Sequence, residues 1–136
     1  MSKSETLETP IDPVESLSVF WSTDCGLEDF VGILSRSVGV RFVDMSDAND
    51  QRFTARLLGF ELICFDEHEL EDEEDVPFSA YSIQLEVVSL ETGVDLLVHS
   101  QLRRCLAQFV MRHLAKYFGC SGMVVRNLRK VIDRTD

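Results

Sequence analysis

The sequence predicts an α+β fold, with a mainly antiparallel sheet flanked by two helices. Two stretches, at about 26–38 and 100–118, show the apolar spacing of amphipathic helices, and each is followed by a glycine. Between them, residues 81–87 alternate apolar and polar side chains, which is typical of a strand with one buried face. Helices that flank such strands favour the α+β class.

The size and composition of the chain predict a single cytoplasmic domain. It has 136 residues, of which 45% are hydrophobic, enough for an ordinary core. Residues 1–15 are polar and acidic, with Pro10 and Pro13, so we expect a flexible leader before one domain at 16–136. The leader has no apolar signal-peptide core, and no apolar run reaches the roughly 20 residues of a membrane span. The four cysteines form no C-x-x-C pair, and isolated thiols fit a reducing compartment.

The first predicted helix follows a short apolar strand at 17–21. Thr23, Asp24 and Cys25 offer capping groups before it, and acidic residues in its first turn suit the helix dipole. Gly39 supplies a C-cap. The apolar residues between follow one helical face, at Leu27, Phe30, Val31, Leu34 and Val38.

Further strands are predicted in the middle of the chain. Residues 40–43 are expected to form a short strand. Residues 53–65 form either one bent strand or two strands that meet at a bulge at Gly59. A third strand at about 80–89 contains the alternating segment, so the residues between 65 and 80 become the long loop of a hairpin.

The second predicted helix is long, with Ser100 as its N-cap and Gly119 as its stop. Its apolar stripe consists of Leu102, Leu106, Phe109, Val110, Leu114, Tyr117 and Phe118. We expect the middle of the stripe to pack on the sheet, at Leu106, Phe109, Val110 and Leu114. A last short strand is predicted at 123–125. The basic tail from Arg126 onward is expected to pair with acidic residues of the same protein.

The most acidic part of the chain is the run at 66–75, in which eight residues are acidic and none is Lys or Arg. The formal net charge of the chain is −11, so the other residues sum to only −3. Because so dense a run repels itself and cannot be buried unpaired, we expect it at the surface. Its carboxylates are Asp66, Glu67, Glu69, Glu71, Asp72, Glu73, Glu74 and Asp75.

Two interpretations of this run remain open, and neither is a metal site. A calcium loop needs a glycine at its sharp turn, and the run contains none. His68 and Glu69 begin like the zinc-protease motif, but Asp72 stands where the second histidine would be. The run is therefore either a solvated loop or a docking surface for a basic protein, because complementary charge speeds association and selects the partner. In a docking surface, Phe78 or Tyr81 would add apolar contact.

Catalytic signatures are missing from the sequence. It contains no G-x-S-x-G, no P-loop and no G-x-G-x-x-G. Cys25 precedes a predicted helix, whose N-terminus can lower a thiol pKa, but a nucleophile also needs a base such as His113 within reach. We therefore predict a protein that is not an enzyme and holds no metal or cofactor. Its acidity argues against binding to nucleic acid or to anionic membranes.

Four segments within residues 57–81 carry a resemblance to a known family. They are Leu57-Leu58-Gly59-Phe60-Glu61-Leu62, Phe65-Asp66-Glu67-His68, Leu70-Glu71-Asp72 and Pro77-Phe78-Ser79-Ala80-Tyr81. Together they are similar to segments of small acidic bacterial immunity proteins of contact-dependent and other polymorphic toxin systems. The resemblance implies an inhibitor that binds one toxin domain, often a basic nuclease, with carboxylates in the place of phosphates. The alternative is an adaptor or subunit of another assembly, with the acidic run as solvated surface.

Overall fold

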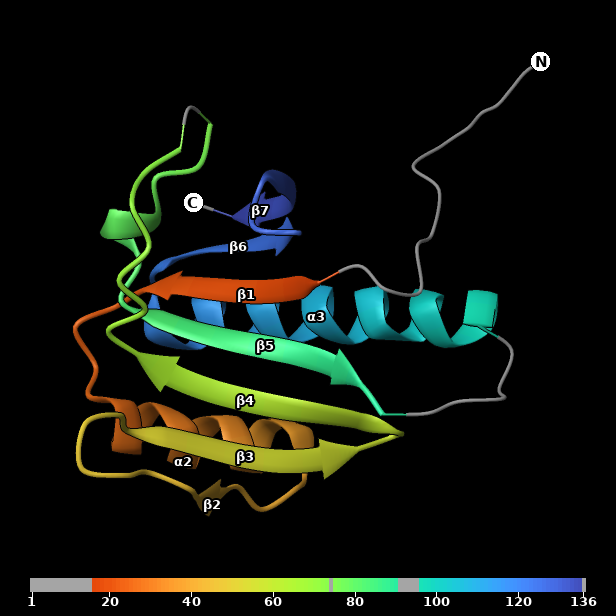
Figure 1. Cartoon of the computed structure of the whole chain (residues 1–136), viewed down its shortest axis with the longest axis horizontal. Helices are drawn as coiled ribbons and strands as arrows, with labels where there is room; N and C mark the ends of the chain where they lie inside the picture. Colours follow the sequence, from red (N-terminus) through yellow and green to blue (C-terminus); the bar gives the residue numbers. More distant parts are fainter. Residues whose placement is uncertain (1–15, 74, 91–95, 136) are drawn as a thin grey trace.

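In the computed structural model, which describes residues 16–73, 75–90 and 96–135, seven strands form one antiparallel sheet with helices on one face (Figure 1). The predicted α+β class is thereby confirmed. The strand order is β2-β3-β4-β5-β1-β6-β7, so the first strand is internal and the C-terminal hairpin forms one edge. The predicted leader at 1–15 lies outside the described residues.

The elements have the following bounds. The strands are β1 Leu17–Ser22, β2 Val43–Asp44, β3 Arg52–Leu57, β4 Phe60–Asp66, β5 Ile83–Ser89, β6 Ser121–Arg126 and β7 Lys130–Thr135. The helices are α2 Leu27–Val38 and α3 Leu96–Phe118, with a short 3-10 turn, η1, at Phe78–Ala80. In Figure 1 both α2 and α3 lie behind the sheet.

The helix α2 confirms the first predicted helix, but its N-terminus is capped differently. Gly26 is the N-cap residue and makes no side-chain capping bond. The hydroxyl of Thr23 instead accepts a hydrogen bond from the N–H of Cys25, at 3.2 Å. Gly39 is the C-cap, as expected, and its φ of 73° is the left-handed conformation that glycine adopts without strain.

Gly59 belongs to a tight hairpin turn and does not interrupt a strand with a bulge. Leu57 lies opposite Phe60 in the antiparallel pair of β3 and β4, so the turn consists of Leu58 and Gly59. Both have positive φ, 55° and 82°, as the central residues of a type I′ hairpin turn do. The turn fixes a register in which β4 sends alternate side chains into the core beneath the helices, namely Phe60, Leu62 and Cys64.

Both edges of the sheet differ from the sequence prediction. β2 covers only Val43–Asp44, where a strand was expected at 40–43. At the other edge the basic tail forms an unpredicted strand, β7, after a turn in which Asn127 and Leu128 have positive φ. The basic tail was expected to pair its cations with acidic residues, and that stays a prediction; the ion pair found here joins a cation of α3 to an acid of the tail, since Arg112 donates two hydrogen bonds to the carboxylate of Asp133, at 2.9 and 2.5 Å.

The helix α3 begins before its predicted cap and buries a different face from the one predicted. Ser100 lies inside the helix and is buried. Val110 and Leu114 are buried as expected and Leu106 is half-buried, but Phe109 is 54% exposed. The prediction that Phe109 packs on the sheet is therefore wrong. Smaller or more flexible side chains take that place, namely Ala107, Met111 and Ala115.

A close approach between α3 and the sheet explains this choice of face. The indole Nε1 of Trp21 in β1 donates a hydrogen bond to the carbonyl oxygen of Met111, at 3.0 Å. Gly122 of β6 lies beneath the same helical turn, and a Cβ there would come within 3.0 Å of the Met111 side chain. The helix therefore sits too close to the sheet for a Phe side chain between them.

The opposite face of the sheet carries a second, smaller apolar cluster. It contains Phe20 of β1 together with Met123 and Val125 of β6. The long connection between β4 and β5 covers these side chains with apolar residues of its own, Val76, Phe78 and Tyr81. The acidic segment of the chain is thus attached to the sheet face that the helices leave open.

Candidate functional site: the acidic loop

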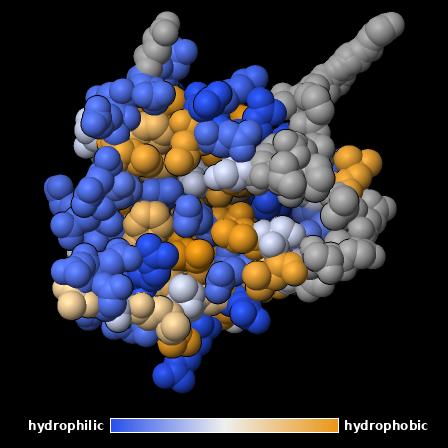
Figure 2. All heavy atoms as spheres, viewed as in Figure 1, coloured by the Kyte–Doolittle hydropathy of each residue, from blue (hydrophilic) through white to orange (hydrophobic). Residues whose placement is uncertain are grey.

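The candidate site is the acidic loop, residues 67–82, which joins β4 to β5. These strands are antiparallel and their pairing ends with Asp66 opposite Ile83, so the predicted hairpin loop is confirmed. Asp66 is half-buried, and Glu74 lies outside the described residues. Figure 2 shows hydrophilic side chains gathered around the loop at the upper left. Its exposed carboxylates are Glu67, Glu69, Glu71, Asp72, Glu73 and Asp75.

Apolar side chains within the loop hold it against the sheet. Val76 and Phe78 are each 1% exposed, and Tyr81 is 9% exposed. The ring centroid of Phe78 lies 5.2 Å from that of Phe20 in β1. Burying one side chain of this size stabilises a fold by about 1.5–3 kcal/mol. Both Phe78 and Tyr81 are therefore buried against the sheet and fix the loop, and a contact of either with a partner stays a prediction.

His68 ties the two ends of the loop together. Its Nδ1 accepts a hydrogen bond from the N–H of Leu70 at 3.0 Å, so the neutral ring carries its proton on Nε2. That Nε2 donates to the carbonyl oxygen of Tyr81 at 2.7 Å. The ring also packs edge-on against Phe20, with centroids 5.5 Å apart. His68 therefore has a structural role, although the sequence offered no signal that distinguished it from its acidic neighbours.

The outer part of the loop is a small backbone-bonded turn. Glu73 and Val76 exchange hydrogen bonds, N–H to O=C, at 2.9 and 3.2 Å, so the chain reverses between them. The carboxylate of Asp72 accepts a hydrogen bond from the N–H of Ser79 at 2.8 Å. This bond, and a further one from the Ser79 side chain, lower the pKa of Asp72. The carboxylates thus stand on a defined backbone.

Two of the exposed acids adopt a backbone conformation that non-glycine residues seldom use. Glu67 has a φ of 51° and Glu69 a φ of 58°. The left-handed conformation costs an ordinary residue roughly 1–2 kcal/mol. Because His68 lies between them and is bonded to both loop ends, its anchoring keeps this strained segment in place.

A hollow of about 330 Å³ lies between the base of the loop and the connection that precedes β3. Four carboxylates line it, from Asp50, Asp66, Glu67 and Glu69. Among the described residues that line it, the one Lys or Arg is Arg52, whose guanidinium pairs with Asp50 at 2.8 Å and lies 5.4 Å from the ring centroid of Phe65. The excess of negative charge suits the hollow to a lysine or arginine side chain.

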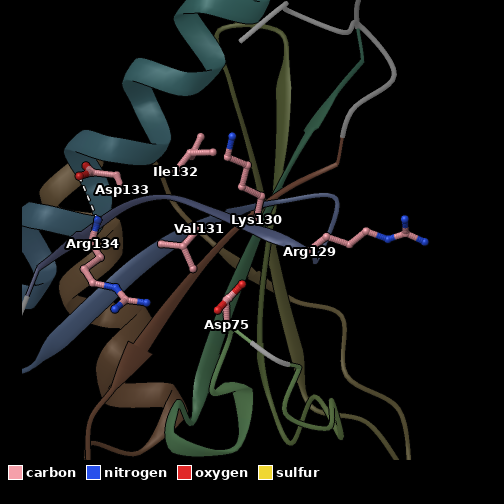
Figure 3. Close-up of a pocket in the computed structure, with 7 residues that line it drawn as sticks. All are labelled: Asp75, Arg129, Lys130, Val131, Ile132, Asp133 and Arg134. Atoms are coloured by element: carbon pink, nitrogen blue, oxygen red, sulfur yellow. Dashed lines mark hydrogen bonds between the residues drawn. The ribbon is translucent and has the colours of Figure 1, made fainter. Parts of the chain in front are cut away.

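A second hollow, of about 550 Å³, separates the acidic loop from β7 (Figure 3). Asp75, Arg129, Lys130 and Arg134 line this space; in Figure 3 the side chain of Val131 points toward Asp75, whereas Lys130 points to the other side of β7 and Arg129 extends away from the loop. The carboxylate of Asp133 also accepts the backbone N–H of Arg134, at 3.0 Å. Because β7 was not predicted, sequence reasoning did not place these cations beside the acidic loop. Charge therefore changes sign over a short distance at this edge of the site.

Burial raises the pKa of three of the cysteine thiols, those of Cys25, Cys64 and Cys120. Burial raises the pKa of the Cys25 thiol, and the negative charge of Asp29 raises it further. The lowered pKa considered from the sequence is therefore wrong. Burial also raises the thiol pKa of Cys64, which is fully buried, whereas Cys105 is exposed. Within residues 16–73, 75–90 and 96–135, no His, Cys, Asp and Glu side chains form a group of three that could hold a metal ion.

Comparisons with known proteins place the chain in no family. No family model, no curated protein and no solved structure matches it. Among the helices of the described part of the chain, none has both the length and the hydropathy to span a membrane. The functional argument therefore depends on the geometry and charge of the acidic loop.

Proposed function

We propose that this chain is a non-catalytic cytoplasmic immunity protein, which neutralises a cognate toxin by docking its acidic loop on the toxin's basic site. The observation that carries the proposal is a set of exposed carboxylates on a backbone fixed from beneath. His68 and Phe78 fix that backbone, because His68 bonds to the far end of the loop and Phe78 is buried against the sheet. The resemblance to immunity proteins within residues 57–81 points to the same function.

Fixing the loop before binding favours tight association. A flexible acidic segment would lose conformational freedom when it docks, whereas this loop has already lost it on folding. The carboxylates also provide a field that attracts a positively charged cleft and speeds encounter. In a nuclease, such a cleft binds phosphates, and carboxylates on a fixed loop can take their place.

The hollow beside the loop adds a specific contact to this general attraction. Its carboxylates, which include Asp66, Glu67 and Glu69, can receive one long cationic side chain of the toxin. Arg52 already neutralises Asp50, so the added cation would pair with the carboxylates of the loop base. The cations of β7 would repel other parts of a basic toxin and so orient it toward the loop.

Co-expression with the candidate toxin tests the proposal. The candidate toxin is sought in the gene immediately upstream, where a gene for a large secreted protein would favour the immunity function. The loop variant changes Glu69, Glu71 and Glu73 to Gln. A control variant makes the same change in net charge on the exposed N-terminus of α2, with Asp24→Asn, Glu28→Gln and Asp29→Asn.

We expect the wild-type chain and the control variant to protect cells, and the loop variant to fail while remaining folded. Full protection by the loop variant would show that the acidic loop is not the docking surface. The absence of a toxin that the wild-type chain neutralises would favour the adaptor or subunit alternative.

A further inference from the structure

His68 is the one histidine of the acidic loop, and both of its ring nitrogens bond to the backbone. Histidine is the side chain whose charge ordinarily changes between about pH 5 and 8. The ring accepts a hydrogen bond at Nδ1 and donates one at Nε2, so its present bonds require the neutral form. The anchor of the loop is therefore a group whose hydrogen-bonding capacity depends on pH.

Protonation of the ring would break one of its two bonds and leave the other. A proton added at Nδ1 would point at the N–H of Leu70, which lies 3.0 Å away, so two donors would face each other. The bond from Nε2 to the carbonyl oxygen of Tyr81 needs a donor and would persist. The charged ring therefore keeps its hold on the far end of the loop and loses its hold on the near end.

The position of the ring leaves it no way to avoid this conflict by turning over. Its centroid lies 5.5 Å from that of Phe20 and 6.4 Å from that of Phe78, edge-on to both rings. A flip of the imidazole about its Cβ–Cγ bond would put carbon atoms where both nitrogens now lie, so the bond to Tyr81 would be lost as well. The conflict is therefore relieved by movement of the backbone at Leu70.

The backbone beside Leu70 is ready to move once that bond is gone. Glu67 and Glu69 have the φ values of 51° and 58° that residues other than glycine adopt only at a cost. The bond between the Leu70 N–H and the ring of His68 closes over Glu69, so it holds part of this strained segment in place. Loss of the bond allows both acidic residues to return to ordinary conformations.

The charges that share the surroundings of the ring are predominantly negative. His68 lines both hollows beside the base of the loop, and so do the carboxylates of Asp66, Glu67 and Glu69. A charged ring released from Leu70 can therefore pair with carboxylates of its own segment. Such pairing lowers the negative charge that the loop presents to a partner.

The other elements around the ring add no net charge. Asp50 and Arg52, from the connection before β3 and from β3, line the first hollow and pair with each other at 2.8 Å. Tyr81 is a further titratable group in the second hollow. The aromatic neighbours from β1 and η1, Phe20 and Phe78, carry no charge.

We infer that His68 is a pH-sensitive switch, which releases Leu70 when its ring is protonated and so unfastens the base of the acidic loop. The release follows from the geometry of the ring and its two backbone partners. Its consequence for the toxin rests on the proposed function: a loosened, less negative loop associates more slowly with a basic site.

Nuclear magnetic resonance of the full chain tests the switch between about pH 7.5 and 5. The ring nitrogen shifts of His68 report its tautomer and protonation. The protection of the Leu70 amide against hydrogen exchange, corrected for the intrinsic exchange rate at each pH, reports its hydrogen bond. The variant His68→Gln keeps a donor and an acceptor but has no titrating group. His113→Gln is the matched control, since His113 is exposed on α3.

We expect the ring to carry its proton on Nε2 at neutral pH. As it becomes charged, the protection of the Leu70 amide should fall about tenfold, a change of roughly 1.4 kcal/mol. His113→Gln should show the same fall, whereas in His68→Gln the protection should be independent of pH. The ratio of the wild-type to the His68→Gln association rate constant with the toxin domain should also fall at acid pH.

Two results would overturn the inference. One is a proton on Nδ1 at neutral pH, and the other is a Leu70 amide whose protection stays constant while the ring titrates. An equal fall in His68→Gln would also contradict it, because another group would then control the loop. A fall at Leu70 in the wild-type chain without any change in toxin association would support the switch and count against the acidic loop as the docking surface.

Discussion

The Nε2 atom of His68 lies 2.7 Å from the carbonyl oxygen of Tyr81 and so joins the two ends of the acidic loop. Because Nδ1 of the same ring accepts the N–H of Leu70, the neutral imidazole satisfies one donor and one acceptor of the backbone. The most acidic segment of the chain thus acquires a fixed shape from a residue that carries no charge in this tautomer.

Replacing His68 with Ala should loosen the loop and destabilise the fold. The change removes two hydrogen bonds and the edge-on contact with Phe20, at a cost of about 1–3 kcal/mol. Urea unfolding measures this cost, and hydrogen exchange at the Leu70 amide reports the local opening. His113→Ala is the control, because His113 is exposed and its removal should cost no more than about 0.5 kcal/mol. Equal effects of the two variants would mean that His68 does not anchor the loop.

Gly122→Ala should destabilise the contact between α3 and the sheet. The added Cβ would lie 3.0 Å from Met111 side-chain atoms and 3.3 Å from the Trp21 ring, so the expected cost is about 1–3 kcal/mol. Gly32→Ala in α2 is the matched control, since a Cβ there meets nothing within 4 Å. That control should gain about 0.4–1 kcal/mol from helix propensity and reduced chain entropy. Thermal unfolding of both variants provides the measurement. A melting temperature of Gly122→Ala at or above that of the wild-type chain would contradict the close approach of α3 to the sheet.

The two apolar faces of α3 should respond differently to truncation. Leu114 is fully buried, so Leu114→Ala should cost about 2–5 kcal/mol. Phe109 is 54% exposed and stacks on His113 in the same helix, so Phe109→Ala should cost less than about 1 kcal/mol. The comparison is made by urea unfolding. A larger loss for Phe109→Ala than for Leu114→Ala would show that the assignment of buried and exposed faces is reversed.

Asp72 and Glu86 should change the pH dependence of stability in opposite directions. Hydrogen bonds from Ser79 lower the folded pKa of Asp72. Its carboxylate therefore stabilises the fold above the unfolded pKa, about 3.9, and this contribution is lost as pH falls through the folded value. Burial raises the folded pKa of Glu86, although Arg52 acts in the opposite direction. Its ionisation therefore removes stability as pH rises from about 4.3 through the folded value.

At pH 7, Asp72→Asn should accordingly be less stable than the wild-type chain, and Glu86→Gln more stable. Both differences should shrink toward zero once the pH lies below the folded pKa of Asp72. Denaturant melts at a series of pH values provide the measurement. A stabilising effect of Asp72→Asn at neutral pH, or a destabilising effect of Glu86→Gln, would contradict these assignments.

The sequence was informative where one local rule decided the structure. Spacing and Gly39 located α2, alternation located β5, and like-charge repulsion placed the acidic run at the surface. The Leu58-Gly59 turn was missed because an apolar stretch divided by one glycine suits either a bulge or a hairpin. β7 was missed because its strand depends on pairing with β6, which no short pattern in the basic tail reveals.

The candidate site shows the same division between local and tertiary information. Composition alone identified the carboxylates, because so dense a run of like charges cannot be buried unpaired and must lie at the surface. The burial of Phe78 and Tyr81 was not predictable, because it depends on Phe20 and Met123, which reach them from other strands. The face chosen by α3 likewise depends on the space that Gly122 leaves for Met111.

The central claim is that the fixed carboxylates of the acidic loop bind a basic toxin site, and association kinetics test it most directly. The association rate constant is measured with the toxin domain at two salt concentrations, for the wild-type chain and for the loop variant with Glu69, Glu71 and Glu73 changed to Gln. Exposed charges are screened over about 8 Å at physiological ionic strength, so the wild-type rate should fall as salt rises. The loop variant should associate more slowly and depend less on salt, with a smaller change in dissociation rate. Identical rates and identical salt dependence for the two proteins would contradict the account.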